Sequence, residues 1–115
     1  MWPGCILNLS KAETMPASWA AAFCSTRGVY LLTRRKTRLQ YVGMASSAGG
    51  FLTRWKEYWT IGYGGSVALK SRERSHYQVS ILETVGSGVS DLELMVLEGR
   101  WKDKLQSREM GLNRN

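Results

Sequence analysis

Glu98 has surroundings that demand a chemical explanation. It borders an apolar stripe that runs along residues 91–105 and includes Leu94 and Trp101. A carboxylate beside such a stripe loses contact with water, so it needs a cationic partner or a bound metal ion. Lys102 lies one helical turn further on and would supply an ion pair. The sequence leaves both explanations open.

Arginine and tyrosine form the second group of chemically capable side chains. Arg54 and Tyr58 lie one helical turn apart, at the border of the apolar stripe of residues 51–59. An arginine presents a planar, permanent charge that fits two phosphate oxygens, although a lone arginine on a helix is commonly just solvated. Tyr30 and Tyr41 lie in apolar runs, where a tyrosine usually packs in a core.

A β-hairpin must position the first two tyrosines. Residues 28–32 and 39–43 are aromatic, aliphatic and β-branched, and the polar residues 33–38 between them predict an antiparallel turn. This turn and a later loop contain the densest positive charge, in Arg34, Arg35, Lys36, Arg38, Lys70, Arg72 and Arg74.

Helices must position the arginine and the glutamate. Residues 51–59 and 91–105 have helical periodicity, and Ser90 with Glu93 predicts a capping box before the second helix. Residues 77–83 alternate as a strand does, which predicts Glu83 on the same face as Ile81. This order predicts an α+β fold with a small antiparallel sheet of about three strands sandwiched by helices.

Length and charge narrow the class of protein. A chain of 115 residues has room for one hydrophobic core, and its 16 basic against 9 acidic residues give a net charge of +7. Such a charge favours a polyanionic partner, most often a nucleic acid. No apolar run is long enough to span a bilayer, the first residues lack the pattern of a signal peptide, and we expect no membrane partner.

The paired triplets of the hairpin resemble the signature of a known enzyme family. Gly28-Val29-Tyr30 and Tyr41-Val42-Gly43 resemble the two motifs of the GIY-YIG nucleases, with valine in place of each isoleucine. Arg54, Glu98 and Asn113 follow in the family's order. The resemblance spans residues 27–113 and is strongest to a restriction-like, phage or mobile-element branch.

The resemblance implies a metal-dependent DNA endonuclease that hydrolyses phosphodiester bonds. In this family pattern Glu98 anchors a divalent cation, Mg²⁺ or Mn²⁺, and Arg54 holds the phosphate. Either Tyr30 or Tyr41 serves as the general base. Because a phenol keeps its proton at neutral pH, a nearby cation must lower its pKa or a metal-bound water must relay its proton. The basic residues of the hairpin turn and the later loop would contact the DNA backbone.

Two further residues complete the implied site, and two positions depart from the pattern. Tyr58 and Asn113 would orient groups around the phosphate. Met44 stands where many members have lysine, and Tyr63 stands where the similar branch has histidine. Met44 in place of lysine motivates a second hypothesis, a catalytically weak or inactive DNA-binding or assembly module with the same fold.

The sequence also predicts the domain organisation and the cellular location of the protein. We expect residues 1–26 to form an N-terminal arm with a short helix, and residues 27–115 to form the nuclease-like domain. With so little chain outside the domain, DNA specificity would come from the arm, from a homodimer or from a partner protein. The expected location is the cytoplasm, for a prokaryotic or phage-encoded protein that acts at the nucleoid.

Overall fold

A four-stranded antiparallel sheet in the order β1-β4-β2-β3 organises the chain. The structure is a computed structural model that describes residues 6–8, 15–34, 37–46, 49–61, 77–86 and 88–113. Its elements in chain order are β1 (Ile6–Asn8), α2 (Ala17–Cys24), β2 (Arg27–Arg34), β3 (Gln40–Ala45), α3 (Gly50–Ile61), β4 (Tyr77–Val85), α4 (Asp91–Leu105) and α5 (Ser107–Met110).

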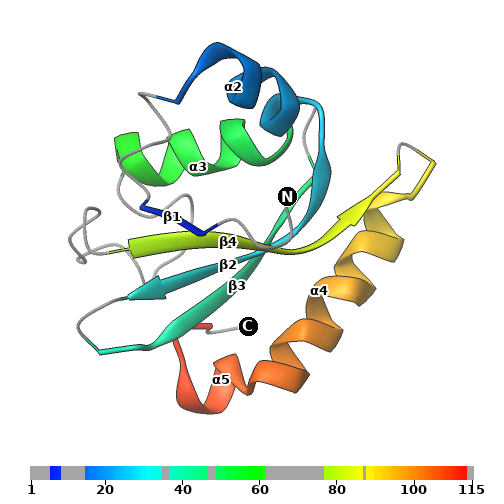
Figure 1. Ribbon diagram of the computed structural model, residues 1–115. Helices are drawn as coiled ribbons and strands as arrows, with labels where there is room; N and C mark the ends of the chain where they lie inside the picture. Colours follow the sequence, from blue (N-terminus) through cyan, green and yellow to red (C-terminus); the bar gives the residue numbers. More distant parts are fainter. Residues whose placement is uncertain are drawn as a thin grey trace.

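Helices cover both faces of this sheet. In Figure 1, α2 and α3 lie on one face, and α4 and α5 lie on the other. The predicted α+β sandwich is therefore confirmed, and the three predicted strands are β2, β3 and β4. The short β1 adds a fourth strand, which pairs with β4 from Ile6 to Asn8, within the segment expected to be an arm.

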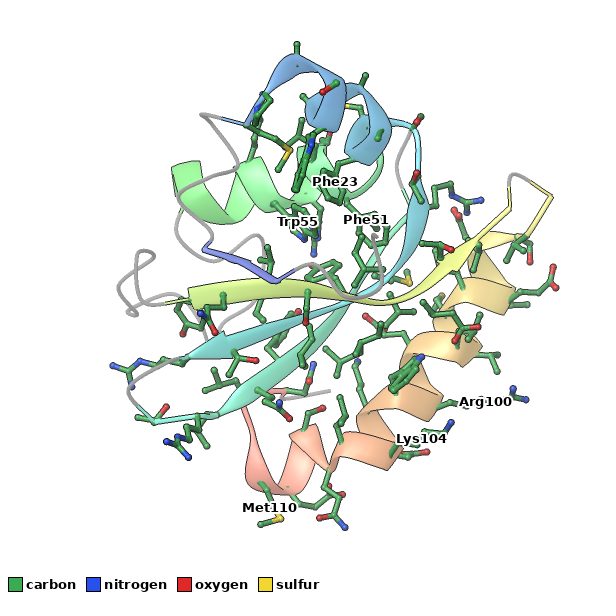
Figure 2. All side chains as sticks on the ribbon, viewed as in Figure 1. Phe23, Phe51, Trp55, Arg100, Lys104 and Met110 are labelled. Atoms are coloured by element: carbon green, nitrogen blue, oxygen red, sulfur yellow. The ribbon has the colours of Figure 1, made fainter. Side chains whose placement is uncertain are left out.

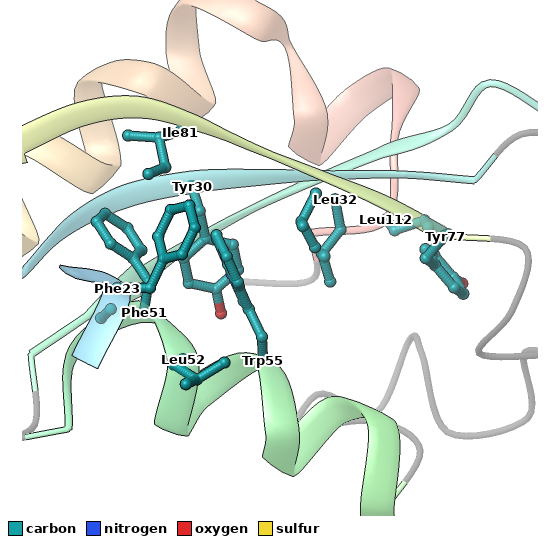
Figure 3. Packing of buried hydrophobic residues seen from close by; sticks show 11 residues of the cluster. Phe23, Tyr30, Leu32, Phe51, Leu52, Trp55, Tyr77, Ile81 and Leu112 are labelled. Atoms are coloured by element: carbon teal, nitrogen blue, oxygen red, sulfur yellow. The ribbon is translucent and has the colours of Figure 1, made fainter. Parts of the chain in front are cut away.

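Alternation along β2 produces two hydrophobic cores. Tyr30 and Leu32 face α2 and α3, where they pack in a cluster with Phe23, Phe51 and Trp55 (Figure 3). The ring centroids of Phe23 and Trp55 are 5.1 Å apart, so α2 shares this core with α3. On the opposite face of the sheet, the second cluster is built by Val29, Leu31, Val42 and Leu94.

A β-bulge corrects the predicted orientation of Glu83. The register of β2 against β4 shifts between Val29 and Tyr30, which pair with Glu83 and Ile81 respectively. The extra residue turns Glu83 away from the face of Ile81. Its carboxylate instead accepts a hydrogen bond from Nε1 of Trp101 on α4, at 3.0 Å, so the prediction of a shared face was wrong.

The helix α4 has the predicted bounds and the predicted start. Ser90 accepts a hydrogen bond from the backbone of Glu93, and the Glu93 carboxylate accepts one from the Ser90 backbone, which forms the capping box. Gln106 ends the helix in a left-handed conformation with φ of 53°. Among the helices of the described ranges, none is long and apolar enough to cross a membrane.

Arg27 ties the start of α4 to the hairpin. Its guanidinium donates to the backbone oxygens of Ser46, at 3.3 Å, and Val89, at 2.9 Å, and it pairs with Asp91 at 2.8 Å. These partners belong to the segment after β3 and to the entry of α4. Arg27 therefore fixes the position of α4 relative to the sheet.

We expect Arg27→Ala to lower the free energy of unfolding by about 1–3 kcal/mol, because two backbone oxygens and one carboxylate lose a charged donor. Urea denaturation monitored by tryptophan fluorescence would measure this. Lys56→Ala, at an exposed position of α3, is the matched control and should change stability by less than about 0.5 kcal/mol. Equal effects of the two substitutions would contradict the structural role of Arg27.

Candidate active site

Tyr30 of the first triplet lies over Gly43 of the second. The two residues are direct partners in the β2–β3 register, and Tyr30 is fully buried. A Cβ atom added to Gly43 would lie 2.5 Å from the phenol oxygen of Tyr30. The ring also makes edge contacts with Phe51 and Trp55, each at a centroid distance of 6.3 Å. The glycine of the second triplet is thus required by the tyrosine of the first.

Tyr41 lies on the same face of the sheet as Tyr30. It pairs with Leu32 and packs against the first core cluster. Tyr41 is half-buried, whereas Tyr30 is fully buried. The two candidate bases therefore share one face of the hairpin and differ in access to solvent.

The helix α3 presents Arg54 beside that face. Arg54 is half-buried and directly precedes Trp55, whose ring packs on Tyr30. Tyr58 lies one turn further along α3, and its side chain lies outside the described part of the structure. The structure thus brings the helix of Arg54 against the strand of Tyr30.

Glu98 on α4 forms the ion pair that the sequence left open. Oε1 of Glu98 lies 3.4 Å from Nζ of Lys102, and only 18% of the Glu98 side chain is exposed. The Lys102 side chain is 5% exposed, which is unusual for a lysine. Lys102 is the charged residue whose burial sequence reasoning missed. The sequence feature that pointed to Lys102 was its spacing of four residues from Glu98.

The residues that could hold a metal ion are few. No group of three or more His, Cys, Asp or Glu side chains comes together within the described ranges. Glu98 remains partly exposed, so its carboxylate can contribute one ligand to a cation that keeps most of its own waters. Mg²⁺ binds in this way, whereas a structural zinc ion requires a full set of protein ligands.

Asn113 holds the outer edge of β3. Its side-chain oxygen accepts a hydrogen bond from the Val42 backbone N–H at 2.8 Å, and its amide nitrogen donates to the Val42 oxygen at 2.9 Å. The Leu112 backbone N–H donates to the oxygen of Gln40 at 2.7 Å. Asn113 is buried, so this geometry favours a positioning role over the predicted orientation of a phosphate.

The sheet separates the predicted site residues into two groups. Tyr30, Tyr41 and Arg54 belong to the face covered by α3, whereas Glu98 belongs to the helix on the other face (Figure 1). Both α3 and α4 contact β3, which is an edge strand. The edge of β3, which both helices contact, is a place where a single substrate could meet both groups.

Two of the predicted DNA-contacting residues lie within the described ranges. Arg34 ends β2 and is half-buried, and Arg38 follows in the exposed turn with φ of 61°. The Nε atom of Arg34 is buried and has no hydrogen-bond partner in the described structure. The other predicted contacts lie outside the described residues, as does Tyr63; they are Arg35, Lys36, Lys70, Arg72 and Arg74.

Met44 occupies the position at which the resembling family often has lysine. Its half-buried side chain packs against the second core cluster, on the α4 side of the sheet. A thioether there contributes packing and no positive charge. Lys102 places an ammonium group beside Glu98 from α4 instead.

Two solved structures have a fold similar to that of this chain. A mutant of the catalytic domain of intron endonuclease I-TevI matches with a TM-score of 0.66 and 23% identity, over 78% of this chain and 94% of that one. The catalytic domain of homing endonuclease I-TevI matches with a TM-score of 0.62 and 24% identity, over 76% and 96%. The sequence itself matches no family model and no curated protein. The chain has the fold of a GIY-YIG nuclease catalytic domain, as the paired triplets predicted.

We expect Asn113→Ala to lower the free energy of unfolding by about 2 kcal/mol or more, because the N–H and the oxygen of Val42 both lose a partner. Hydrogen exchange would show the specific effect, a loss of protection at the Val42 amide. Met110→Ala, at an exposed position of α5, is the control. Unchanged exchange at Val42 would show that Asn113 does not hold the edge of β3.

Proposed function

We propose that this protein is a metal-dependent DNA endonuclease that hydrolyses phosphodiester bonds. The observation that supports this most directly is the fold, which covers nearly the full length of a nuclease catalytic domain. In this fold the two triplets of the resemblance face each other, with Tyr30 opposite Gly43. The net charge of +7 fits a nucleic acid as the partner.

The proposed site uses the edge of β3 as the place where a phosphate binds. Arg54 approaches from α3 and offers two donors to phosphate oxygens, which orients the phosphorus atom for attack. The hairpin turn with Arg34 and Arg38 holds the neighbouring DNA backbone without reading its sequence. The strand itself is held in place by Asn113 and by the contact of Tyr30 with Gly43.

Hydrolysis then requires the proton of the attacking water to be removed. We assign this role to one of the two hairpin phenols, Tyr30 or Tyr41, which share the face of Arg54. The water oxygen forms a bond to phosphorus as its proton passes to the phenolate, and the leaving oxygen departs with the bonding electron pair and takes a proton from solvent. A divalent cation, when bound at Glu98, would supply positive charge to the phosphate as negative charge accumulates in the transition state.

Lys102 acts on Glu98 in this proposal as a positioning residue. A buried ammonium beside the carboxylate restrains the orientation of Glu98 and leaves its second oxygen for a cation. The cation preference for Mg²⁺ or Mn²⁺ and the cytoplasmic setting stay predictions.

A second candidate function is a DNA-binding or assembly module that does not cleave. The ion pair of Glu98 with Lys102 favours it, because this contact accounts for the carboxylate without any metal. Met44 favours it as well, because the side chain packs in the core. Tight, salt-sensitive DNA binding without cleavage in Mg²⁺ or Mn²⁺, on plain, nicked and branched DNA, would identify this function.

We expect Glu98→Gln to reduce nicking of supercoiled plasmid in Mg²⁺ by about 100-fold or more, the scale of losing one charged contribution to the transition state. DNA affinity, measured by fluorescence anisotropy, should change little. Glu93→Gln on the same helix is the control, because glutamine keeps the capping box and removes one carboxylate charge. Equal nicking by wild type and Glu98→Gln would refute the assignment of Glu98.

Separate substitutions of the two hairpin tyrosines would identify the base. Phenylalanine at the correct position should lower the cleavage rate at saturating DNA by about 100-fold, since it removes the proton acceptor and keeps the ring packing. Tyr77→Phe, another buried tyrosine of the same core, is the control. Wild-type rates for both Tyr30→Phe and Tyr41→Phe would exclude a tyrosine base.

A further inference from the structure

The outward face of α4 exposes an unusual amount of apolar surface. Leu92, Met95 and Val96 are 71%, 53% and 54% exposed, although the same helix buries Leu94 completely. The only other large hydrophobic residue exposed to this extent in the described ranges is Met110 of α5. Contiguous exposed apolar residues on a small protein commonly mark an interaction surface.

A groove runs beside these residues along the axis of α4. It has a volume of about 330 Å³ and is lined by Val89, Glu93, Val96, Leu97 and Arg100. Glu93 and Arg100 lie seven residues apart, on the same flank of the helix, with opposite charges. Figure 2 shows Arg100 projecting from α4 away from the sheet.

Gly99 adds an independent observation about the same face. Glycine inside a helix costs about 1 kcal/mol relative to alanine. Apart from the neighbouring residues and the backbone of α4 itself, a Cβ atom added at Gly99 would meet no atom of the described residues within 4 Å, so no described contact requires the glycine. A glycine in such a place allows the backbone of another helix to approach closely.

These features fit one another across a two-fold axis. Leu92, Val96 and Gly99 of α4 occupy the d, a and d positions of a heptad pattern, and Glu93 and Arg100 both occupy position e. In an antiparallel helix pair, positions e of the two helices face each other. Val96 then packs against the partner's Gly99, while Glu93 faces the partner's Arg100 on each side of the axis.

We propose that two copies of this chain form an antiparallel dimer through their α4 helices. The charges favour a second copy of this chain as the partner. A two-fold axis reverses the direction of the helix, so Glu93 of each copy would face Arg100 of the other. A parallel arrangement would lack this pairing, and DNA would leave the apolar residues uncovered. The dimer would hold two copies of the candidate active site, although dimerisation itself does not depend on the proposed function.

The expected interface is small. One helix of 15 residues per subunit provides less surface than a standard stable complex, so the dimer should dissociate on dilution. Sedimentation velocity of the full chain, from micromolar to millimolar concentration at physiological salt, should show a reversible monomer–dimer equilibrium. A monomer throughout this range would overturn the proposal.

Charge substitutions test the register of the pair. Arg100→Glu should raise the dimer dissociation constant by about tenfold or more. The new carboxylate would repel Glu93 of the other subunit at each end of the helix pair. Glu93→Lys should do the same, and the two substitutions together should restore dimerisation. Because Glu93 also forms the capping box, thermal melting of each variant must accompany the measurement. A double variant no better than Arg100→Glu alone would rule out the proposed register.

Gly99→Gln separates dimerisation from folding. Glutamine is a good helix former and has open space at this position, so the melting temperature of the monomer should rise. The longer side chain would occupy the place of the partner's Val96, so the dissociation constant should rise by about tenfold or more. A variant that is more stable and still dimerises like the wild type would show that another surface forms the dimer.

Discussion

The contact of the Tyr30 ring with the backbone of Gly43 fixes the register of the central hairpin. Side chains alternate along a strand, so a slip of one residue would turn Tyr30 toward α4 and turn Val29 and Leu31 toward α3. Tyr30 is fully buried and meets Phe51 and Trp55 at their edges, which places α3 on the hairpin. The positions of both helical layers therefore depend on this pair of strands.

The edge of β3 is the second constraint on the structure. An unpaired edge strand exposes backbone groups that can pair with other chains. Here the C-terminal segment covers part of that edge, through the backbone of Leu112 and the side chain of Asn113. Because α3 and α4 both reach β3 from opposite faces, this held edge is also where the proposed substrate would bind.

Charged residues lie both along α4 and at the end of the hairpin. On the α4 side, Glu98 pairs with Lys102 and Asp91 pairs with Arg27, while Glu93 and Arg100 face outward on the helix. At the end of the hairpin, Arg34 and Arg38 bring positive charge to the turn beside β3. The two arginines offer positive charge to a polyanion at the hairpin end, and Arg27 with Asp91 ties the start of α4 to β2.

Local pattern was sufficient to predict most of the elements. The hairpin, the periodic helices and the capping box at Ser90 follow from interactions between residues close in sequence, and the structure confirms them. The paired triplets also indicated the nuclease fold, because their residue types and order are visible in the sequence alone. Sequence periodicity likewise predicted that Arg54 lies on the helix that the structure shows as α3.

Only the tertiary structure decided how distant segments meet. The bulge that turns Glu83 toward Trp101, the pairing of β1 with β4, and the partner of Asn113 all depend on residues far apart in the chain. The burial of Lys102 depends equally on how α4 rests on the sheet. The sequence by itself determined which residues were available for chemistry and on which elements they lie, because periodicity is a local property. Which of them lie near each other was decided by packing, because burial and hydrogen bonding across the fold are satisfied only when all the elements are in place.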